Sequence, residues 1–143
     1  MSLIGQVVTR LAELKPASLK MVEGALSYAA VQVVPPAQSM PAVYVVELTE
    51  GFNAAAGMSG AKTQAGLVTI AAIVWMSARN LDKQAAPDAL ESLRTAIKDK
   101  IFGFAPTGYD GAEFAHAGGR LLLAEDYTVV WQQAFSLQIE ARQ

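Results

Sequence analysis

The stretch from Tyr127 to Ala141 alternates between apolar and polar residues, and it constrains the fold more than any other pattern in the sequence. Successive side chains of a strand point to opposite sides of the sheet, so this alternation predicts a strand with one buried and one wet face. The buried face would carry four apolar residues and one amide, namely Trp131, Gln133, Phe135, Leu137 and Ile139. A sheet built from such strands needs a second layer over its apolar face.

Two amphipathic segments are suited to form that second layer. Residues 3–14 repeat apolar side chains at helical spacing, with Ser2 as a cap and Pro16 as a stop. The segment from Pro87 to Ile101 has a second apolar face and acidic residues near its start. Pro87 suits a first helical turn and Gly103 suits the end. We therefore expect two helices.

Three further segments are predicted to be strands. Pro41 precedes an alternating strand over 42–50, and the apolar run at 67–77 is a buried strand rather than a helix because it is rich in β-branched residues. A glycine- and alanine-rich loop, 51–62, joins the two as an antiparallel pair. Residues 19–22 suit a short strand, whereas 25–34 suit either a helix or a strand. Gly118 and Gly119 suggest a turn between short strands.

This order of elements favours one α+β domain over residues 1–143. We expect two layers, with the helices packed on one face of a mixed, mainly antiparallel sheet.

Composition excludes several classes of function. The 143 residues carry a net charge of −2, and the 11 basic residues are scattered, which disfavours a nucleic-acid surface and sequence-specific recognition. The chain has no cysteine, which excludes disulfides, thiolate metal sites and a cysteine nucleophile. The most apolar run, 66–78, is shorter than the roughly 20 residues that a membrane-spanning helix needs, and the N-terminal segment lacks a signal-peptide pattern.

The sequence GMSGAKT at Gly57–Thr63 superficially suggests a phosphate-binding loop. Such a loop follows the pattern G-x-x-x-x-G-K-[ST], in which the two glycines are five residues apart and the lysine directly follows the second glycine. It also joins a strand to a helix. Here Gly57 and Gly60 are three apart, Ala61 separates Gly60 from the lysine, and a strand follows. We interpret the segment as a connection between strands.

No catalytic constellation is visible in the sequence. His116 is the single histidine, so a histidine-based zinc site is excluded, and we expect it in a surface turn. The acidic residues are dispersed, with no pair placed for acid–base work, although dispersed carboxylates leave a hard-cation site open. Trp75 and Trp131 lie in predicted strands and suit core packing. The sequence predicts no catalytic residue, cofactor site or metal ligand.

Five features of the C-terminal half follow one another in a recognisable order. They are a helix with Leu93 and Ile97, the pattern F-x-P-x-G-Y at 104–109, A-G-G-R-L-L at 117–122, the acidic pair at 125–126, and W-Q-x-x-F at 131–135. Together they resemble the tail terminator proteins of long-tailed bacteriophages and related prophages. In the N-terminal half the layout is similar, with P-A-V-Y-V at 41–45 before a strand, a loop and a strand.

The resemblance implies a structural protein without catalysis. It implies a hexameric ring on the head-proximal end of the tail tube, which stops tube polymerisation and presents a surface to the head-completion protein. The implied partners are other copies of the chain, the tail tube protein and the connector, with no membrane. The implied location is the neck end of the virion tail, and the bacterial host cytoplasm during assembly.

Four residues are candidates for contacts in such an assembly. Phe52 and Met58 are apolar residues in a loop of small residues, and Lys62 lies at its end. Arg120 is either a charge that ends an apolar strand or a contact at an assembly edge. Two alternatives remain open: a ligand-binding or enzymatic α+β domain, marked by a deep polar pocket with a perturbed acid or base, and a neighbouring head–tail connector protein, distinguished by its partner.

Overall fold

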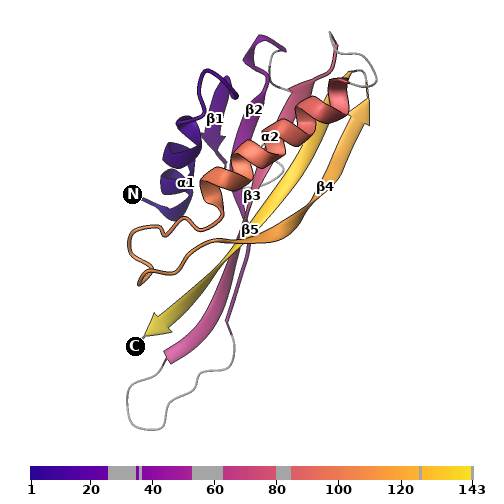
Figure 1. Cartoon of the computed structure of the whole chain (residues 1–143). Helices are drawn as coiled ribbons and strands as arrows, with labels where there is room; N and C mark the ends of the chain where they lie inside the picture. The colour runs from indigo at the N-terminus through magenta and orange to yellow at the C-terminus, as the bar shows by residue number, and fades with distance from the viewer. Residues whose placement is uncertain (26–34, 36, 53–62, 80–84, 126, 143) are drawn as a thin grey trace.

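The described residues form one five-stranded sheet with two helices over one of its faces (Figure 1). The computed structural model describes residues 1–25, 35, 37–52, 63–79, 85–125 and 127–142. The elements in chain order are α1 (Leu3–Ala12), β1 (Met21–Gly24), the 3-10 turn η2 (Ala37–Ser39), β2 (Ala42–Phe52), β3 (Thr63–Ser77), α2 (Ala85–Ile101), β4 (Ala115–Glu125) and β5 (Thr128–Arg142).

The strands are arranged in the order β1-β2-β3-β5-β4. The short strand β1 runs parallel to β2, and the other three pairings are antiparallel. The predicted α+β class, with helices on one face of a mixed and mainly antiparallel sheet, is therefore confirmed.

Local sequence signals explain where the two helices begin and end. The Ser2 side chain accepts a hydrogen bond from the backbone N–H of Gly5 at 3.0 Å, which satisfies one of the free donors at the start of α1. Helix α2 begins two residues before Pro87, which leaves the proline in the first turn. It is followed by Gly103 in the left-handed region at φ 81°, a conformation that glycine adopts without strain.

The principal core lies between the helices and the sheet. Alternate residues of β2, β3 and β5 face the helices, as the alternation in the sequence predicts. Their partners on the helices include Leu11, Leu93 and Ile97, all buried. At the sheet the same core contains Val43, Val45, Val68, Ile70, Ala72, Val74, Phe135 and Leu137.

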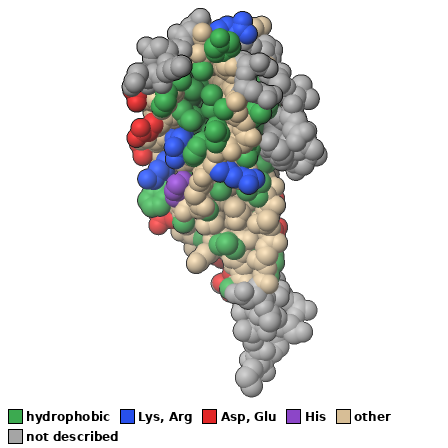
Figure 2. All heavy atoms as spheres, turned by 90° about the vertical axis from the view of Figure 1, so that its right-hand side faces the viewer, with side chains coloured by type: hydrophobic (Ala, Val, Ile, Leu, Met, Phe, Trp, Pro, Cys, Tyr) green, Lys and Arg blue, Asp and Glu red, His purple; other side chains and the backbone are tan. Residues whose placement is uncertain are grey.

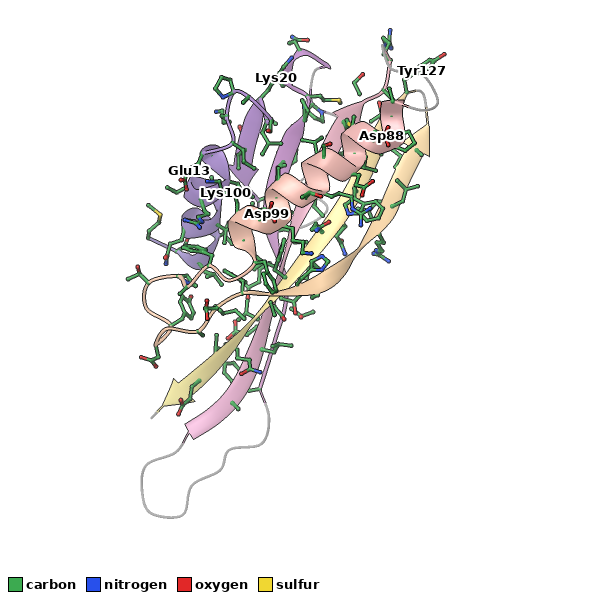
Figure 3. All side chains as sticks on the ribbon, viewed as in Figure 1. Glu13, Lys20, Asp88, Asp99, Lys100 and Tyr127 are labelled. Atoms are coloured by element: carbon green, nitrogen blue, oxygen red, sulfur yellow. The ribbon has the colours of Figure 1, made fainter. Side chains whose placement is uncertain are left out.

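The two helices are also tied to each other at one end. Lys100 of α2 forms an ion pair with Glu13 at the end of α1, with 3.4 Å between Nζ and Oε1 (Figure 3). Arg10 of α1 donates from Nε to the backbone carbonyl of Lys100 at 2.9 Å. These contacts fix α1 beside the C-terminal end of α2.

The opposite face of the sheet carries a second, smaller apolar cluster. It contains Met40, Ala42, Val46, Ala71, Ile73, Trp75 and Val130, all buried. Residues 70–76 of β3 are thus buried on both faces of the sheet, which agrees with the continuous apolar run in the sequence. Of the segment 25–34, which suits either a helix or a strand, residues 26–34 lie outside the described residues.

The strands are longer than the helices that cover them. A strand of 15 residues, the length of β3 and β5, extends about 50 Å, whereas a helix of 17 residues, the length of α2, extends about 25 Å. The ends of three strands consequently project beyond the helices (Figure 1). We call this projection the arm; it consists of residues 47–52 of β2, 63–67 of β3 and 138–142 of β5.

Three local expectations from the sequence were wrong. Gly118 and Gly119 do not form a turn, because β4 continues through them from Ala115 to Glu125 and pairs with β5 on both sides. The register shifts by one residue between His116 and Gly118, and Gly118 adopts φ 103° at this bulge. His116 therefore lies in a strand rather than in a turn. The strand expected from residue 67 starts four residues earlier, at Thr63.

The core is tested by Ile97, which is fully buried between α2 and the sheet. Replacing Ile97→Ala leaves a cavity, and we expect the free energy of unfolding to fall by about 2–5 kcal/mol. Urea denaturation followed by circular dichroism measures this change. Thr95→Ala, at an exposed position of the same helix, is the control and should change stability by less than about 0.5 kcal/mol; equal effects of the two would contradict the assigned packing.

Candidate assembly surfaces

The four contact residues predicted from the sequence do not form one site. Phe52 ends β2 on the arm, and Arg120 lies exposed in the middle of β4. Arg120 pairs with Gln132, which faces away from the helices, whereas Phe52 lies on the helix side. Met58 and Lys62, like the rest of the GMSGAKT segment before Thr63, lie outside the described residues.

Phe52 is held in place by a glycine on the neighbouring strand. It pairs with Gly66 of β3, and its ring lies directly over that residue, since a Cβ built on Gly66 would be 2.5 Å from Phe52 Cδ1. A glycine here lets the aromatic ring lie flat on the strand. The ring is still 41% exposed, so the sheet positions Phe52 without burying it.

The arm exposes apolar side chains on both of its faces. Leu48, Phe52 and Leu67 are 36%, 41% and 44% exposed. Phe52 and Gly66 face the helix side, and Leu67, as the next residue in β3, faces the other side. Exposed apolar surface that is gathered on one projection is typical of a contact with another protein.

A second surface lies where side chains of α2 come close to Trp131 of β5 and His116 of the edge strand β4. The guanidinium group of Arg94 stacks on the ring of Trp131, with 3.9 Å between its central carbon and the ring centroid. This cation–π contact holds the charge flat against the sheet. Lys98 is exposed one turn further along α2. Figure 2 shows blue basic side chains beside the histidine, drawn purple, on this side of the molecule. We call Arg94, Lys98 and His116 the basic flank.

Two successive hydrogen bonds beneath the basic flank determine which ring nitrogen of His116 carries the proton. Trp131 Nε1 can only donate, and it donates to Gln133 Oε1 at 2.9 Å. The amide nitrogen of Gln133 then faces His116 Nε2 at 3.1 Å. Because an amide nitrogen only donates, His116 Nε2 must accept, so the neutral ring carries its proton on Nδ1. Gln133 is only 2% exposed, and this network satisfies its buried amide.

The surroundings lower the pKa of His116 below its ordinary value of 6.5. Desolvation is the largest cause, followed by the positive charges of Lys98 and Arg94. The residue is exposed overall, but its Nε2 is directed at the buried Gln133 and not at water. Protonation would place two donors face to face, so the hydrogen bond acts in the same direction as the neighbouring charges.

Sequence reasoning missed the residues of the basic flank. Two features of the sequence could have indicated them. Arg94 and Lys98 are four residues apart on a predicted helix and so lie on one face of it, and Gln133 is a polar residue on an otherwise apolar strand face. Their proximity to His116 depends on how β4 pairs with β5. The sequence analysis did not predict this pairing because it placed a turn at Gly118 and Gly119.

The described residues offer little that resembles a catalytic centre. A cavity of about 340 Å³ lies between the first turns of α2 and the end of β3, lined by Ser18, Pro41, Met76, Ser77, Ala89, Ser92 and Leu93. None of these side chains is an acid or a base, and His116 and Tyr44, whose pKa values are shifted, are not among them. In the described part of the chain, no cluster of His, Asp and Glu is suited to a metal ion, and no helix there is long and apolar enough to cross a membrane.

Comparison with known proteins identifies the class to which this fold belongs. The family model described as "Phage tail terminator protein" matches residues 4–143, nearly the whole chain. The chain belongs to the phage tail terminator family, and it is therefore a structural protein of the virion tail.

The solved structures show the same fold in another virion. A chain from the "Virion of native gene transfer agent (GTA) particle" superposes with a TM-score of 0.52 at 15% sequence identity, and the match covers 99% of this chain and 100% of that chain. A search of curated proteins gave no match. At this identity the structural likeness establishes the fold alone.

The pKa of His116 can be tested by following its ring protons in an NMR titration. We expect a pKa below 6.5, and the variant Lys98→Gln should raise it because one repelling charge is removed. Because the folded state binds this proton less readily than the unfolded state, the contribution of His116 to stability is present above pH 6.5 and is lost as the pH falls through the lowered pKa. Lys20→Gln, an exposed lysine before β1 (Figure 3), is the control; a pKa at or above 6.5 in the unaltered chain would rule out the proposed hydrogen-bond pattern.

The close packing of β4 on Trp131 can be tested at Gly119. A Cβ on Gly119 would lie 2.8 Å from Trp131 Nε1, so Gly119→Ala must displace the indole from Gln133 and from Arg94. We expect a loss of about 1–3 kcal/mol in the free energy of unfolding, together with a changed tryptophan fluorescence spectrum. The matched control is Gly51→Ala on β2, where a Cβ would meet no atom within 4 Å. An equal response at both glycines would show that Trp131 does not pack as described.

Proposed function

We propose that six copies of this chain form a closed ring on the head-proximal end of the phage tail tube. The ring ends polymerisation of the tube protein and offers its other side to the head-completion protein. The chain acts in the neck of the virion tail and assembles in the cytoplasm of the bacterial host. It performs no catalysis in this role and needs no cofactor.

The observation that carries this proposal is the arm, considered with the family to which the chain belongs. A terminator must bind the last ring of the tube and must also bind copies of itself. The arm offers apolar side chains on both faces, which a single chain leaves in water. Burial of such surface is a main source of free energy in protein association, so we assign the arm to contacts within the assembly.

The ring explains how one chain can both bind and stop the tube. Identical contacts repeated by rotation close on themselves and leave no free end within the ring. Along the tube axis the two sides of the ring differ, so one side can complement the tube protein while the other cannot recruit another tube subunit. Termination then follows from the shape of the ring and needs no chemical step.

The cavity beside α2 gives less support to a ligand-binding or enzymatic role. It is lined by apolar atoms and hydroxyl groups, and it contains no titratable side chain that acid–base chemistry would use. A connector function at a neighbouring layer of the neck differs from termination only in the partner, so tube binding distinguishes the two.

If the arm makes contacts within the assembly, a substitution at Phe52 should impair assembly without unfolding the chain. Phe52→Ser removes an exposed aromatic side chain from the arm, and we expect the chain to remain folded while it loses the ability to limit tube length. The control is Phe102→Ser, since Phe102 is 56% exposed at the end of α2 and lies off the arm. Purified tube protein is polymerised with each variant, and tube lengths are measured by electron microscopy.

Light scattering coupled to gel filtration gives the oligomeric state in the same experiment. A closed ring of six chains has a mass of about 90 kDa, six times the 15.1 kDa of the single chain. The oligomeric state is measured under two conditions, with the chain alone and with tube protein present. An unaltered chain that neither forms a ring nor shortens tubes under both conditions would overturn the proposed function.

A further inference from the structure

One row of paired residues crosses the sheet from an acidic side chain at one lateral edge to the basic flank at the other, and we call residues of one row residues at the same height. Glu47 of β2 pairs with Ile70 of β3, Ile70 pairs with Phe135 of β5, and Phe135 pairs with His116 of β4. Residues paired in this way point to the same side of a sheet. Glu47 and His116 therefore lie at the two ends of one row across four strands, and both face the helix side.

Both ends of this row lie at free edges. β1 pairs only with residues 42–45 of β2, so from there onward β2 has no partner on its outer side among the described residues. β4 is the last strand at the other edge. An acidic position thus ends the row on one side, and the basic flank begins on the other.

Each edge is interrupted by a bulge at this height. The register shifts between Glu47 and Thr49 on β2, and between His116 and Gly118 on β4. Bulges of this kind hinder the addition of a further strand by backbone hydrogen bonds. A neighbour at either edge would consequently be recognised through side chains.

The charges at the two edges have no oppositely charged partner within the described part of the chain. Arg94 and Lys98 form no ion pair there, and the Nε of Arg94 is buried without a hydrogen-bond partner. Glu91 and Asp99, the acidic residues nearest to Arg94 and Lys98 in sequence, are exposed and form no ion pair with them in the described part of the chain. Glu47 and Glu50 on β2 are exposed and likewise unpaired.

We propose that Glu47 of one copy of the chain binds the basic flank of the next copy, at Lys98 and Arg94. The occupant of the basic flank is thus a second copy of this chain. The inference rests on the proposed ring and specifies the contact by which the ring closes.

The register explains why this contact would generate a ring. Two different surfaces on one chain make a head-to-tail contact, which closes when rotation returns the last copy to the first. A rotation about an axis that runs along the strands carries each copy sideways and leaves its position along that axis unchanged. Because Glu47 and His116 lie in one row, such a rotation brings the acidic edge of one copy beside the basic flank of the next.

The side chains of the basic flank are well prepared to receive a carboxylate. Stacking on Trp131 restricts the guanidinium of Arg94 before any partner arrives, so less conformational entropy is lost on binding. Exposed Leu121 pairs with Trp131 beside it and adds apolar surface to the contact.

A charge exchange tests the contact. Glu47→Lys and Lys98→Glu each place like charges opposite one another at every contact of the ring, so each single variant should fail to form the ring at a concentration where the unaltered chain assembles. The double variant restores opposite charges and should regain it. Asp99→Lys, a reversal at an exposed position of α2 beside Lys98 in sequence (Figure 3), is the control and should assemble normally.

The mass of each variant is measured by light scattering coupled to gel filtration, with and without tube protein, and circular dichroism establishes that each variant is folded. Ring formation by the unaltered chain should also weaken as salt rises from 0.05 to 0.5 M, on the order of the range over which exposed charges become screened. Salt-independent assembly would overturn the contact.

The outcomes separate this inference from the proposed function. If the unaltered chain forms rings and limits tube length while the single variants assemble equally well, or the double variant is no better than they are, the contact is wrong and the function stands. If the unaltered chain forms no ring and does not limit the tubes, both are overturned. Loss in each single variant with recovery in the double variant supports the contact directly.

Discussion

The antiparallel pairing of β3 with β5 sets the dimensions on which the rest of the structure depends. The two strands pair without interruption from Thr63 with Arg142 to Ser77 with Thr128, which makes a ribbon of about 50 Å. Neither α1 nor α2, the two α-helices in the described part of the chain, is long enough to cover it. One end of the ribbon therefore supports a core on both faces, while the other end extends as the arm, with apolar side chains in water. A protein that acted alone would gain little from such a projection, whereas a component of an assembly can bury it against its partners.

The same sheet organises the charged residues that lie at its edges. Row by row, the pairing determines that Glu47 and His116 face the same side at the same height, although they are far apart in the sequence. Buried Gln133 then joins the edge to the core by linking His116 to Trp131. The lateral edges thus differ in charge while sharing one rigid support. That combination suits a repeated contact between copies, because rigid surfaces lose little entropy when they associate.

How well the sequence predicted each element depended on whether neighbouring residues were enough to specify it. The capped helix after Ser2 and the alternating strand to Ala141 were predicted because their periodicity is local. The paired glycines at 118 and 119 were misinterpreted, because a turn and a bulge use the same residue and only the pairing of β4 with β5 distinguishes them. Of the predicted contact residues, Phe52 lies on the arm, whereas Arg120 faces the other side of the sheet. The basic flank was not predicted because it combines residues of the helix α2 with a residue of the strand β4, which tertiary packing brings together.

The sequence by itself determined the two-layer class, the apolar faces of its elements and the family pattern, since these depend on side-chain periodicity and on short ordered motifs. Only the tertiary structure decided which strand ends project, which residues share a row across the sheet, and which charges lie at each edge. The physical reason is that strand pairing is non-local: a shift of one residue in register, or a single bulge, exchanges the faces of a strand without changing its alternating pattern. The surfaces that we assign to assembly are products of that register.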